Sequence, residues 1–222
     1  MRPREGQADS DPPASSDMEL ILASKSPRRR EILTDMGVRF HVITEDVDET
    51  CPVTSPERFV ELISAKKCAA VGDDVLRTNG FDPAGCIVLA ADTVVETGGE
   101  ILGKPHSEDE ARSMLHKLSG KEHRVISGFS LRGPGPDGRV ISMSSHTVTT
   151  VSFCDISPDD LETYVRSREP YDKAGAYAIQ GHGIYWVKGI SGDFYNVVGL
   201  TVYDIAKALE NRYGIGFPGF GV

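Results

Sequence analysis

The segment 24–30, SKSPRRR, combines residues that bind anions with the start of a predicted helix. Ser26 followed by Pro27 is typical of a helix N-terminus, with serine as the capping residue and proline in the first turn. Backbone N–H groups at such a terminus and the forked guanidinium of Arg28 suit phosphate oxygens. Because arginines in the first turn oppose the helix dipole, the pattern indicates that an anion binds here. A solvated basic turn balanced by nearby carboxylates is the alternative.

A carboxylate lies inside the apolar segment 87–95, IVLAADTVV. Burying Asp92 in such a strand costs free energy unless the carboxylate is paired or bound to a metal. Asp92 is therefore a candidate general base or metal ligand. Lys104 follows a predicted hairpin turn at residues 98–99 and is able to reach the same place. The alternative is a structural aspartate that accepts hydrogen bonds from the backbone.

Two further segments carry polar groups that suit the binding of a metal ion or of a flat ligand. The acidic run at residues 45–49, EDVDE, has the density of carboxylates that can hold Mg²⁺ beside a triphosphate, although a solvated loop fits its composition equally well. In the segment 180–183, QGHG, the glycines permit close approach to a flat ligand. Gln180 offers both a donor and an acceptor, which suits the imide edge of uracil or thymine. A plain turn between strands is the alternative.

Strands and helices are mixed along the chain, which predicts an α/β fold with a mixed, twisted sheet flanked by helices. The expected strands are residues 18–23, 40–44, 86–96, 101–102, 123–131, 140–153 and 184–187. The expected helices are residues 28–36, 55–70, 107–118, 157–166 and 201–213, and residues 72–85 are expected to form a polar loop. We expect a disordered tail at residues 1–17, one domain over residues 18–213 and a C-terminal extension at residues 214–222.

The overall composition limits the class of ligand. The 222 residues carry a formal net charge of −9, which disfavours binding to nucleic acid through its phosphates. No apolar stretch has the length that a membrane span requires. The four cysteines form no CxxC pair, so reduced thiols in a cytoplasmic protein are expected. A small anion bound by locally gathered basic residues remains compatible with the charge.

Several of these segments together carry a resemblance to a known family. They are LASKSPRR (22–29), ADTVV (91–95), GKP (103–105), LSGKEH (118–123), YAIQG (177–181) and NVVGL (196–200). The chain resembles the Maf family of nucleoside triphosphate pyrophosphatases, and the segments occur in the order of that family over about residues 18–210. The resemblance implies a Maf/ITPase-like fold with a nucleotide-binding cleft, and a homodimer.

The resemblance also implies roles for single residues. Asp92 corresponds to the proton acceptor, and Glu49 to a partner carboxylate that acts either on the water or on a divalent metal cation. The implied cation is Mg²⁺ or Mn²⁺, with Glu49 and Asp92 as its ligands. Lys67, rather than its neighbour Lys66, and Lys104 correspond to catalytic lysines that bind phosphate. The implied substrate-binding residues are Ser24, Ser26, Arg28, Arg29, Thr93 and Gln180.

Base preference in the family depends on the positions of Arg28, Thr93 and Gln180. With glutamine at position 180, the chain resembles the subgroup that acts on dTTP and UTP. Modified pyrimidine triphosphates are further candidate substrates. The expected function is hydrolysis of these triphosphates to the monophosphate and diphosphate. The alternative is a nucleotide-binding regulator of cell division without significant turnover.

Overall fold

One mixed sheet of seven strands organises the structure, a computed structural model that describes residues 18–221. The strand order is β2-β1-β3-β5-β6-β7, and β4 also pairs with β3. The strands are β1 (Glu19–Leu22), β2 (His41–Val42), β3 (Cys86–Thr97), β4 (Glu100–Leu102), β5 (Glu122–Pro134), β6 (Val140–Phe153) and β7 (Val187–Ser191). β1 is parallel to both of its neighbours, and the other pairs are antiparallel. The expected α/β fold with a mixed sheet is confirmed.

The long strand β3 has a gap along one of its edges. β5 pairs with one edge over residues 88–96, whereas the other edge is shared by β1 at residues 86–89 and β4 at residues 95–97. Residues 90–94 therefore have no partner strand on that second edge. Asp92 and Thr93 lie in this stretch and, as neighbours in a strand, point to opposite faces of the sheet. Only at an open edge can both side chains line the same cavity.

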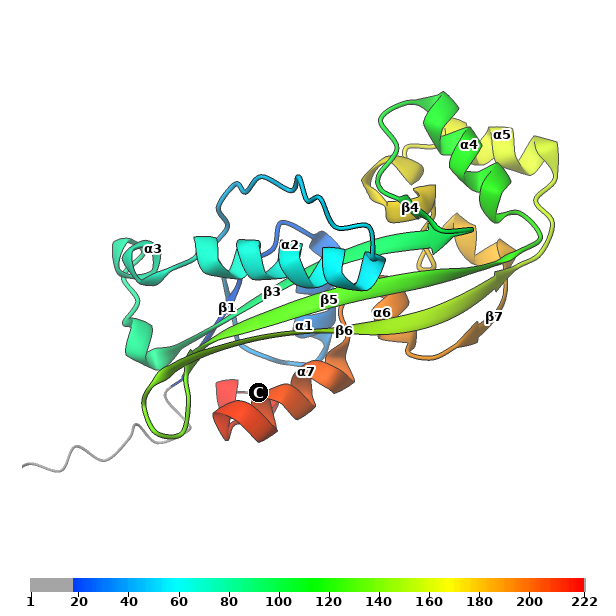
Figure 1. Ribbon diagram of the computed structural model, residues 1–222. Coiled ribbons are helices and arrows are strands. Elements are labelled where there is room, and N and C mark those ends of the chain that lie inside the picture. Colours follow the sequence, from blue (N-terminus) through cyan, green and yellow to red (C-terminus); the bar gives the residue numbers. More distant parts are fainter. Residues whose placement is uncertain (1–17, 222) are drawn as a thin grey trace, which may run out of the picture.

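Helices cover both faces of the sheet (Figure 1). α2 (Pro56–Ala70) lies along one face, where Val60 packs against β3 and β5. The opposite face packs against α1 (Pro27–Asp35) and α7 (Val202–Ala208), with α6 (Phe194–Val198) nearby. Phe129 is 1% exposed in this second layer. Full burial of such a side chain contributes about 1.5–3 kcal/mol, so the two layers fix the position of β3.

A second group of helices closes one end of the long strands (Figure 1). α4 (Glu108–Leu118) and α5 (Pro158–Arg166) pack around a separate cluster that includes Leu102 and Phe153. Both helices begin as their sequences predict, because the hydroxyl oxygen of Ser107 or Ser157 accepts a hydrogen bond from the third backbone N–H after it. Val187 and Val197 pack against both this cluster and the α1–α7 layer.

The end of the chain packs against the α1–α7 layer. A short π-helical turn (Leu209–Tyr213) continues α7, and the following segment buries Phe217 and Phe220 in the same cluster as Leu89. Residues 214–221 thus contribute to the core of the domain. The tail expected at residues 1–17 lies outside the described residues.

Two sequence expectations are wrong. Residues 72–85 contain α3 (Asp73–Thr78) and a 3-10 turn (Pro83–Gly85) instead of only a loop. α3 buries a single large side chain, Leu76, so its sequence shows no helical period. The apolar run 184–187 is not a strand, since His182–Trp186 forms a 3-10 turn with Ile184 51% exposed, and β7 begins only at Val187.

Candidate active site

A cavity of about 720 Å³ opens at the gap in β3. Its lining comes from the β1–α1 junction, the loop before α2, α2 itself, β3 and the segment 172–180. The structure brings together every residue that the sequence singled out for catalysis or binding, since all of them line this cavity: Ser24, Ser26, Arg28, Arg29, Glu49, Lys67, Asp92, Thr93, Lys104 and Gln180.

Lys67 connects the two carboxylates of the cavity. Its ammonium nitrogen lies 2.7 Å from Asp92 Oδ1 and 2.8 Å from Glu49 Oε1. The Asp92 side chain is 14% exposed, so its charge is stabilised mainly by this contact. The carboxylate oxygens thus converge on one cation.

Close packing of α2 on the sheet sets the position of Lys67. Gly128 pairs directly with Asp92 across β5 and β3. A Cβ atom at position 128 would lie 2.5 Å from the carbonyl carbon of Val60 in α2, which is closer than real Cβ contacts. Glycine at this position therefore lets α2 approach the strand that carries Asp92.

The neighbouring lysine has a different place. Lys66 Nζ donates hydrogen bonds to the carbonyl oxygens of Asp48 and Thr50, at 3.0 and 2.9 Å. Lys66 therefore holds the backbone on both sides of Glu49, while Lys67 contacts the carboxylate itself. The acidic run is thereby folded against α2 and turned toward Asp92.

Arg29 fills the gap in the sheet edge. Its guanidinium donates to the carbonyl oxygens of Ala91 and Gly199, both at 2.7 Å, and to the hydroxyl oxygens of Ser24 and Thr93. Burial lowers the pKa of Arg29 to about 10, and the nearby Asp92 carboxylate opposes this effect. The side chain therefore remains cationic at neutral pH, and most of its donors are used within the protein. Its charge contributes to the potential of the cavity.

Arg28 is oriented differently from Arg29. Its guanidinium is paired with Asp172, at 3.0 Å to the carboxylate and 3.2 Å to the backbone oxygen. The start of α1 beside it lacks a side-chain cap, because Ser26 makes no capping hydrogen bond, and no acidic residue lies in the first turn. Free N–H groups and the helix dipole at this point favour an anion.

The remaining expected residues take two kinds of position, inside the protein or exposed on the cavity wall. Thr93 is held inside the protein, since its hydroxyl group lies 2.8 Å from Ser127 Oγ and 3.1 Å from Arg29. Ser24 is also buried, and its oxygen accepts from the N–H of Ser26. Lys104 and Gln180 are exposed on the cavity wall, where they are accessible to a ligand.

Comparison with known proteins decides the family. The model of the family described as Maf-like protein matches residues 19–212. The chain belongs to the Maf family.

Curated relatives of this Maf chain match it over nearly their whole length. A dTTP/UTP pyrophosphatase of Clostridioides difficile is 40% identical over 199 residues, which cover 89% of this chain and 97% of the relative. The dTTP/UTP pyrophosphatase of Thermococcus onnurineus is 40% identical, and the match covers 88% of this chain and 99% of the relative. That of Symbiobacterium thermophilum is 41% identical and covers 91% and 96%.

Among solved structures, a HAM1 protein from Coxiella burnetii is 14% identical to this chain, with a TM-score of 0.41. The match covers 61% of this chain and 73% of the HAM1 chain. The family assignment therefore rests on the sequence matches.

Sequence reasoning did not single out Asp172 of the Maf chain. Asp172 belongs to the segment YDKAGAY, whose charged pair falls outside any periodic pattern. Hydrogen bonds from Lys173 and Arg28 lower the pKa of its carboxyl group although burial opposes them. Only the folded chain shows this residue beside Arg28, 144 positions away in the sequence.

His123 supports a wall of the Maf cavity. The residue is 2% exposed. Its Nε2 lies 2.8 Å from the hydroxyl oxygen of Tyr177, which lines the cavity. Burial lowers the pKa of His123 to about 4, so the ring is neutral at physiological pH.

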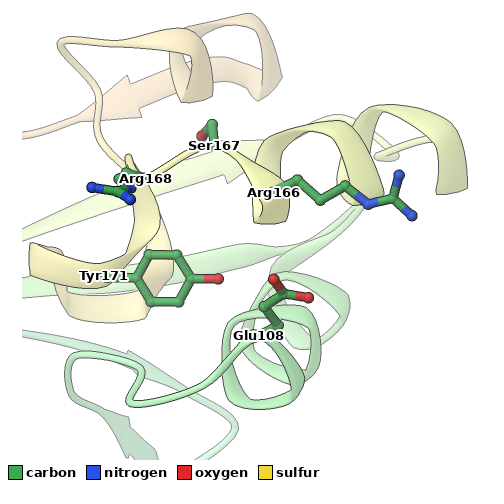
Figure 2. A pocket seen from close by; sticks show the side chains of 5 residues that line it. All are labelled: Glu108, Arg166, Ser167, Arg168 and Tyr171. Atoms are coloured by element: carbon green, nitrogen blue, oxygen red, sulfur yellow. The ribbon is translucent and has the colours of Figure 1, made fainter.

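A second cavity of about 560 Å³ lies between α4 and the segment after α5 (Figure 2). It is lined by Glu108, Arg166, Ser167, Arg168 and Tyr171. In Figure 2 the side chains of Arg166 and Arg168 point in opposite directions, so their charges do not converge on a ligand. This cavity contains none of the residues expected for catalysis.

Among residues 18–221, no helix has the length and apolar character that a membrane crossing requires.

Proposed function

We propose that this Maf protein hydrolyses dTTP and UTP to the monophosphate and pyrophosphate in the cavity at the β3 gap. One observation carries the proposal: Asp92 lies in direct contact with Lys67 in a cavity that also contains the uncapped start of α1. A general base beside cationic groups suits attack of water on a phosphate. The names of the relatives supply the substrate class. A regulator that only binds nucleotides has no need of the buried carboxylate.

A divalent cation is part of the proposal, and the carboxylates fit one. Glu49 and Asp92 already converge on a single cation, the Lys67 ammonium, which stands where a metal ion would be attracted. Residues 18–221 contain no group of three or more His, Cys, Asp or Glu residues arranged for a metal. Mg²⁺ commonly uses one or two carboxylates together with phosphate oxygens and water. Bound in this way, Mg²⁺ or Mn²⁺ would supply positive charge at the triphosphate.

The proposed reaction is a single displacement at the α-phosphorus. The oxygen of a water molecule forms a bond to this phosphorus, and Asp92 accepts the proton that the water loses. The bond between the α-phosphorus and the oxygen that bridges to the β-phosphorus breaks, and pyrophosphate leaves. Lys104, Arg28 and the N–H groups at the start of α1 bind the phosphate oxygens and stabilise the charge that develops.

Base recognition is proposed for the outer wall of the cavity. Gln180 presents an exposed amide, which can donate to and accept from the imide edge of thymine or uracil. Thr93 and Arg28 line the same cavity, but each is engaged with another side chain. Thr93 would therefore shape the base site, whereas Arg28 would exchange Asp172 for a phosphate oxygen of the substrate.

A substrate panel tests the proposal. Purified protein is incubated with dTTP, UTP, modified pyrimidine triphosphates, dCTP and 7-methyl-GTP, each with Mg²⁺, with Mn²⁺ or with a chelator. We expect pyrophosphate and monophosphate in equal amounts from dTTP and UTP, and only with metal. Tight binding of nucleotide without release of pyrophosphate would support the regulatory alternative instead.

The proposal extends to a cytoplasmic homodimer. All four cysteines are free thiols, which suits a reducing compartment that contains nucleotides. Large apolar side chains are exposed in the segment 184–195, including Tyr185 at 81% and Phe194 at 42%, next to the edge strand β7. Such a surface favours association. Sedimentation of the wild type and of Tyr185→Arg tests this, since the dimer should dissociate in the variant.

A further inference from the structure

The carboxylate of Glu169 sits behind the turn that carries Gln180. Its side chain is 18% exposed. Glu169 Oε2 lies 2.8 Å from the ring nitrogen Nδ1 of His182 and accepts from the backbone N–H of His182 at 3.2 Å. Glu169 Oε1 accepts from the backbone N–H of Gly183 at 3.5 Å. Both carboxylate oxygens are therefore directed at the residues that follow Gln180.

The turn approaches Glu169 so closely that a side chain at position 181 would force the Glu169 carboxylate to move. A Cβ atom there would lie 2.2 Å from Glu169 Oε1 and 2.7 Å from the carboxyl carbon. The backbone of Gly181 is extended, with φ −171°, so a side chain at this position would disturb the contact with Glu169 and not the torsion angles. The carboxylate and the turn thus form a fitted pair.

A buried tyrosine joins the same contact. The hydroxyl group of Tyr164 donates to Glu169 Oε1 at 2.9 Å and accepts from the backbone N–H of Ala178 at 3.3 Å. Tyr164 itself is 4% exposed and packs edge-on against Trp186, with ring centroids 4.7 Å apart. Glu169 and Tyr164 together hold the chain on both sides of Gln180.

The Glu169 backbone belongs to the segment that also holds Arg28. Lys173 Nζ donates to the carbonyl oxygen of Glu169 at 3.2 Å and contacts the carboxylate of Asp172. Asp172 in turn pairs with Arg28. Residues 169–173 therefore connect two elements of the cavity wall, the Gln180 turn and the start of α1.

We propose that Glu169 is a positioning residue for base selection, which fixes the Gln180 amide at the orientation needed to pair with a pyrimidine imide. The inference rests on the proposed function, because it deepens the account of the same cavity. Glu169 itself does not line the cavity, so it acts through the turn. A loosened turn lets the amide rotate, and the site then loses its preference for the imide of thymine over the amino group of cytosine.

Substitution of Glu169 separates base selection from chemistry. Glu169→Gln keeps the size of the side chain but presents an amide NH₂ group, which cannot accept a hydrogen bond, to the backbone N–H of His182 or of Gly183. We expect the ratio of kcat/KM for dTTP over dCTP to fall about tenfold, with a higher KM for dTTP and a kcat at saturation within about threefold of wild type. Glu162→Gln is the matched control, because Glu162 lies on α5 and pairs with Arg112 instead.

A second variant tests whether the close contact is responsible. Gly181→Ala should lower the dTTP preference as Glu169→Gln does, since the new methyl group displaces the carboxylate. It should also lower the melting temperature of the wild type but not that of a Glu169→Ala background, where the clash is absent. Unchanged base preference in either Glu169→Gln or Gly181→Ala, or an equal loss in Glu162→Gln, would overturn the inference.

Binding of non-hydrolysable α,β-imido analogues keeps this inference distinct from the proposed function. The wild type should bind the dTTP analogue more tightly than the dCTP analogue, and Glu169→Gln should reduce this difference about tenfold. Equal binding of both analogues by the wild type would overturn the inference. Selective binding without pyrophosphate release from dTTP would overturn the proposed function and leave the positioning role supported.

Discussion

The side chain of Lys67 lies between Glu49 and Asp92. With contacts of 2.8 and 2.7 Å, its single positive charge lies between two carboxylates that would otherwise repel each other. In the proposed reaction, a divalent cation would compete with the ammonium group for the same oxygens. The triphosphate offers Lys67 new partners, so the substrate and the metal should enter together.

Replacement of Lys67 by methionine should therefore have two opposite effects. Without nucleotide, Lys67→Met should bind Mn²⁺ at least tenfold more tightly than wild type, or about 1.4 kcal/mol, because the competing charge is gone. Turnover should fall because a group that binds phosphate is lost. Electron paramagnetic resonance of free Mn²⁺ measures the first effect, and pyrophosphate release measures the second.

Lys66→Met is the control for this prediction. Lys66 contacts only the backbone of the acidic loop among the hydrogen bonds described for residues 18–221. Its removal should not tighten Mn²⁺ binding. Weaker or unchanged Mn²⁺ affinity in Lys67→Met would show that Lys67 and the metal do not compete.

The gap in β3 is closed by a side chain and not by a strand. Arg29 donates to Ala91 and Gly199, and thereby satisfies carbonyl groups where β1 and β4 leave the edge open. Lysine cannot reproduce this fork of donors. The element that builds the site therefore depends on Arg29 for its stability, whereas Arg28 points to Asp172 at the surface.

Arg29→Lys should destabilise the protein by about 2–4 kcal/mol, because buried carbonyl oxygens lose their partners. Arg28→Lys should change the free energy of unfolding by no more than about 0.5 kcal/mol while it raises KM. Urea unfolding of both variants gives the comparison. Equal loss of stability in the two variants would contradict the separate roles of the two arginines.

The stability of the β5 region should depend on pH through His123. Its pKa is near 6.5 in the unfolded chain and about 4 in the fold. Between these values the unfolded state binds more protons, so stability falls as the pH is lowered from 6.5 to 4. By pH 5 the loss should be about 2 kcal/mol.

Free energies of unfolding at pH 7.5 and pH 5 test this prediction. In His123→Gln, which has no titrating ring, the difference between the two pH values should be smaller by the amount assigned to His123. Glu57 serves as a reference, because hydrogen bonds from Ser55 and Arg124 lower its pKa to about 2 and it loses its contribution only at more acidic pH. An unchanged pH dependence in His123→Gln would show that another group is responsible.

Elements with strong local signals could be predicted from the sequence. Ser55 and Pro56 mark the start of α2, and Ser107 and Ser157 those of α4 and α5, because capping is a local interaction. α3 and β7 could not be predicted, since α3 buries one large side chain, and Ile184 and Tyr185 in the apolar run before β7 are exposed. The components of the site were predictable, but the gap in β3 arises from how β1 and β4 divide one edge. Contacts such as Glu169 with the Gln180 turn exist only in the fold.

At the scale of the whole molecule, a net charge of −9 surrounds a cavity that gathers Arg28, Arg29, Lys67 and Lys104. The acidic surface disfavours long polyanions, while the local cations attract one small anion. The KM for dTTP should therefore depend on the salt concentration. Raising the ionic strength from about 0.05 to 0.5 M should increase KM for dTTP severalfold with little change in kcat, because screening weakens the attraction of the free substrate. Steady-state kinetics measure it, and a KM independent of salt would contradict the account.

The position of bond cleavage and the role of Asp92 can be tested in one measurement. Hydrolysis of dTTP is carried out in ¹⁸O-labelled water with the wild type and with Asp92→Asn, and the products are examined by mass spectrometry. We expect the label in the monophosphate and none in pyrophosphate, and a rate about 10²–10⁴-fold lower in the variant because the general base is lost. Label in pyrophosphate would contradict attack at the α-phosphorus, and undiminished turnover by Asp92→Asn would contradict the role of Asp92.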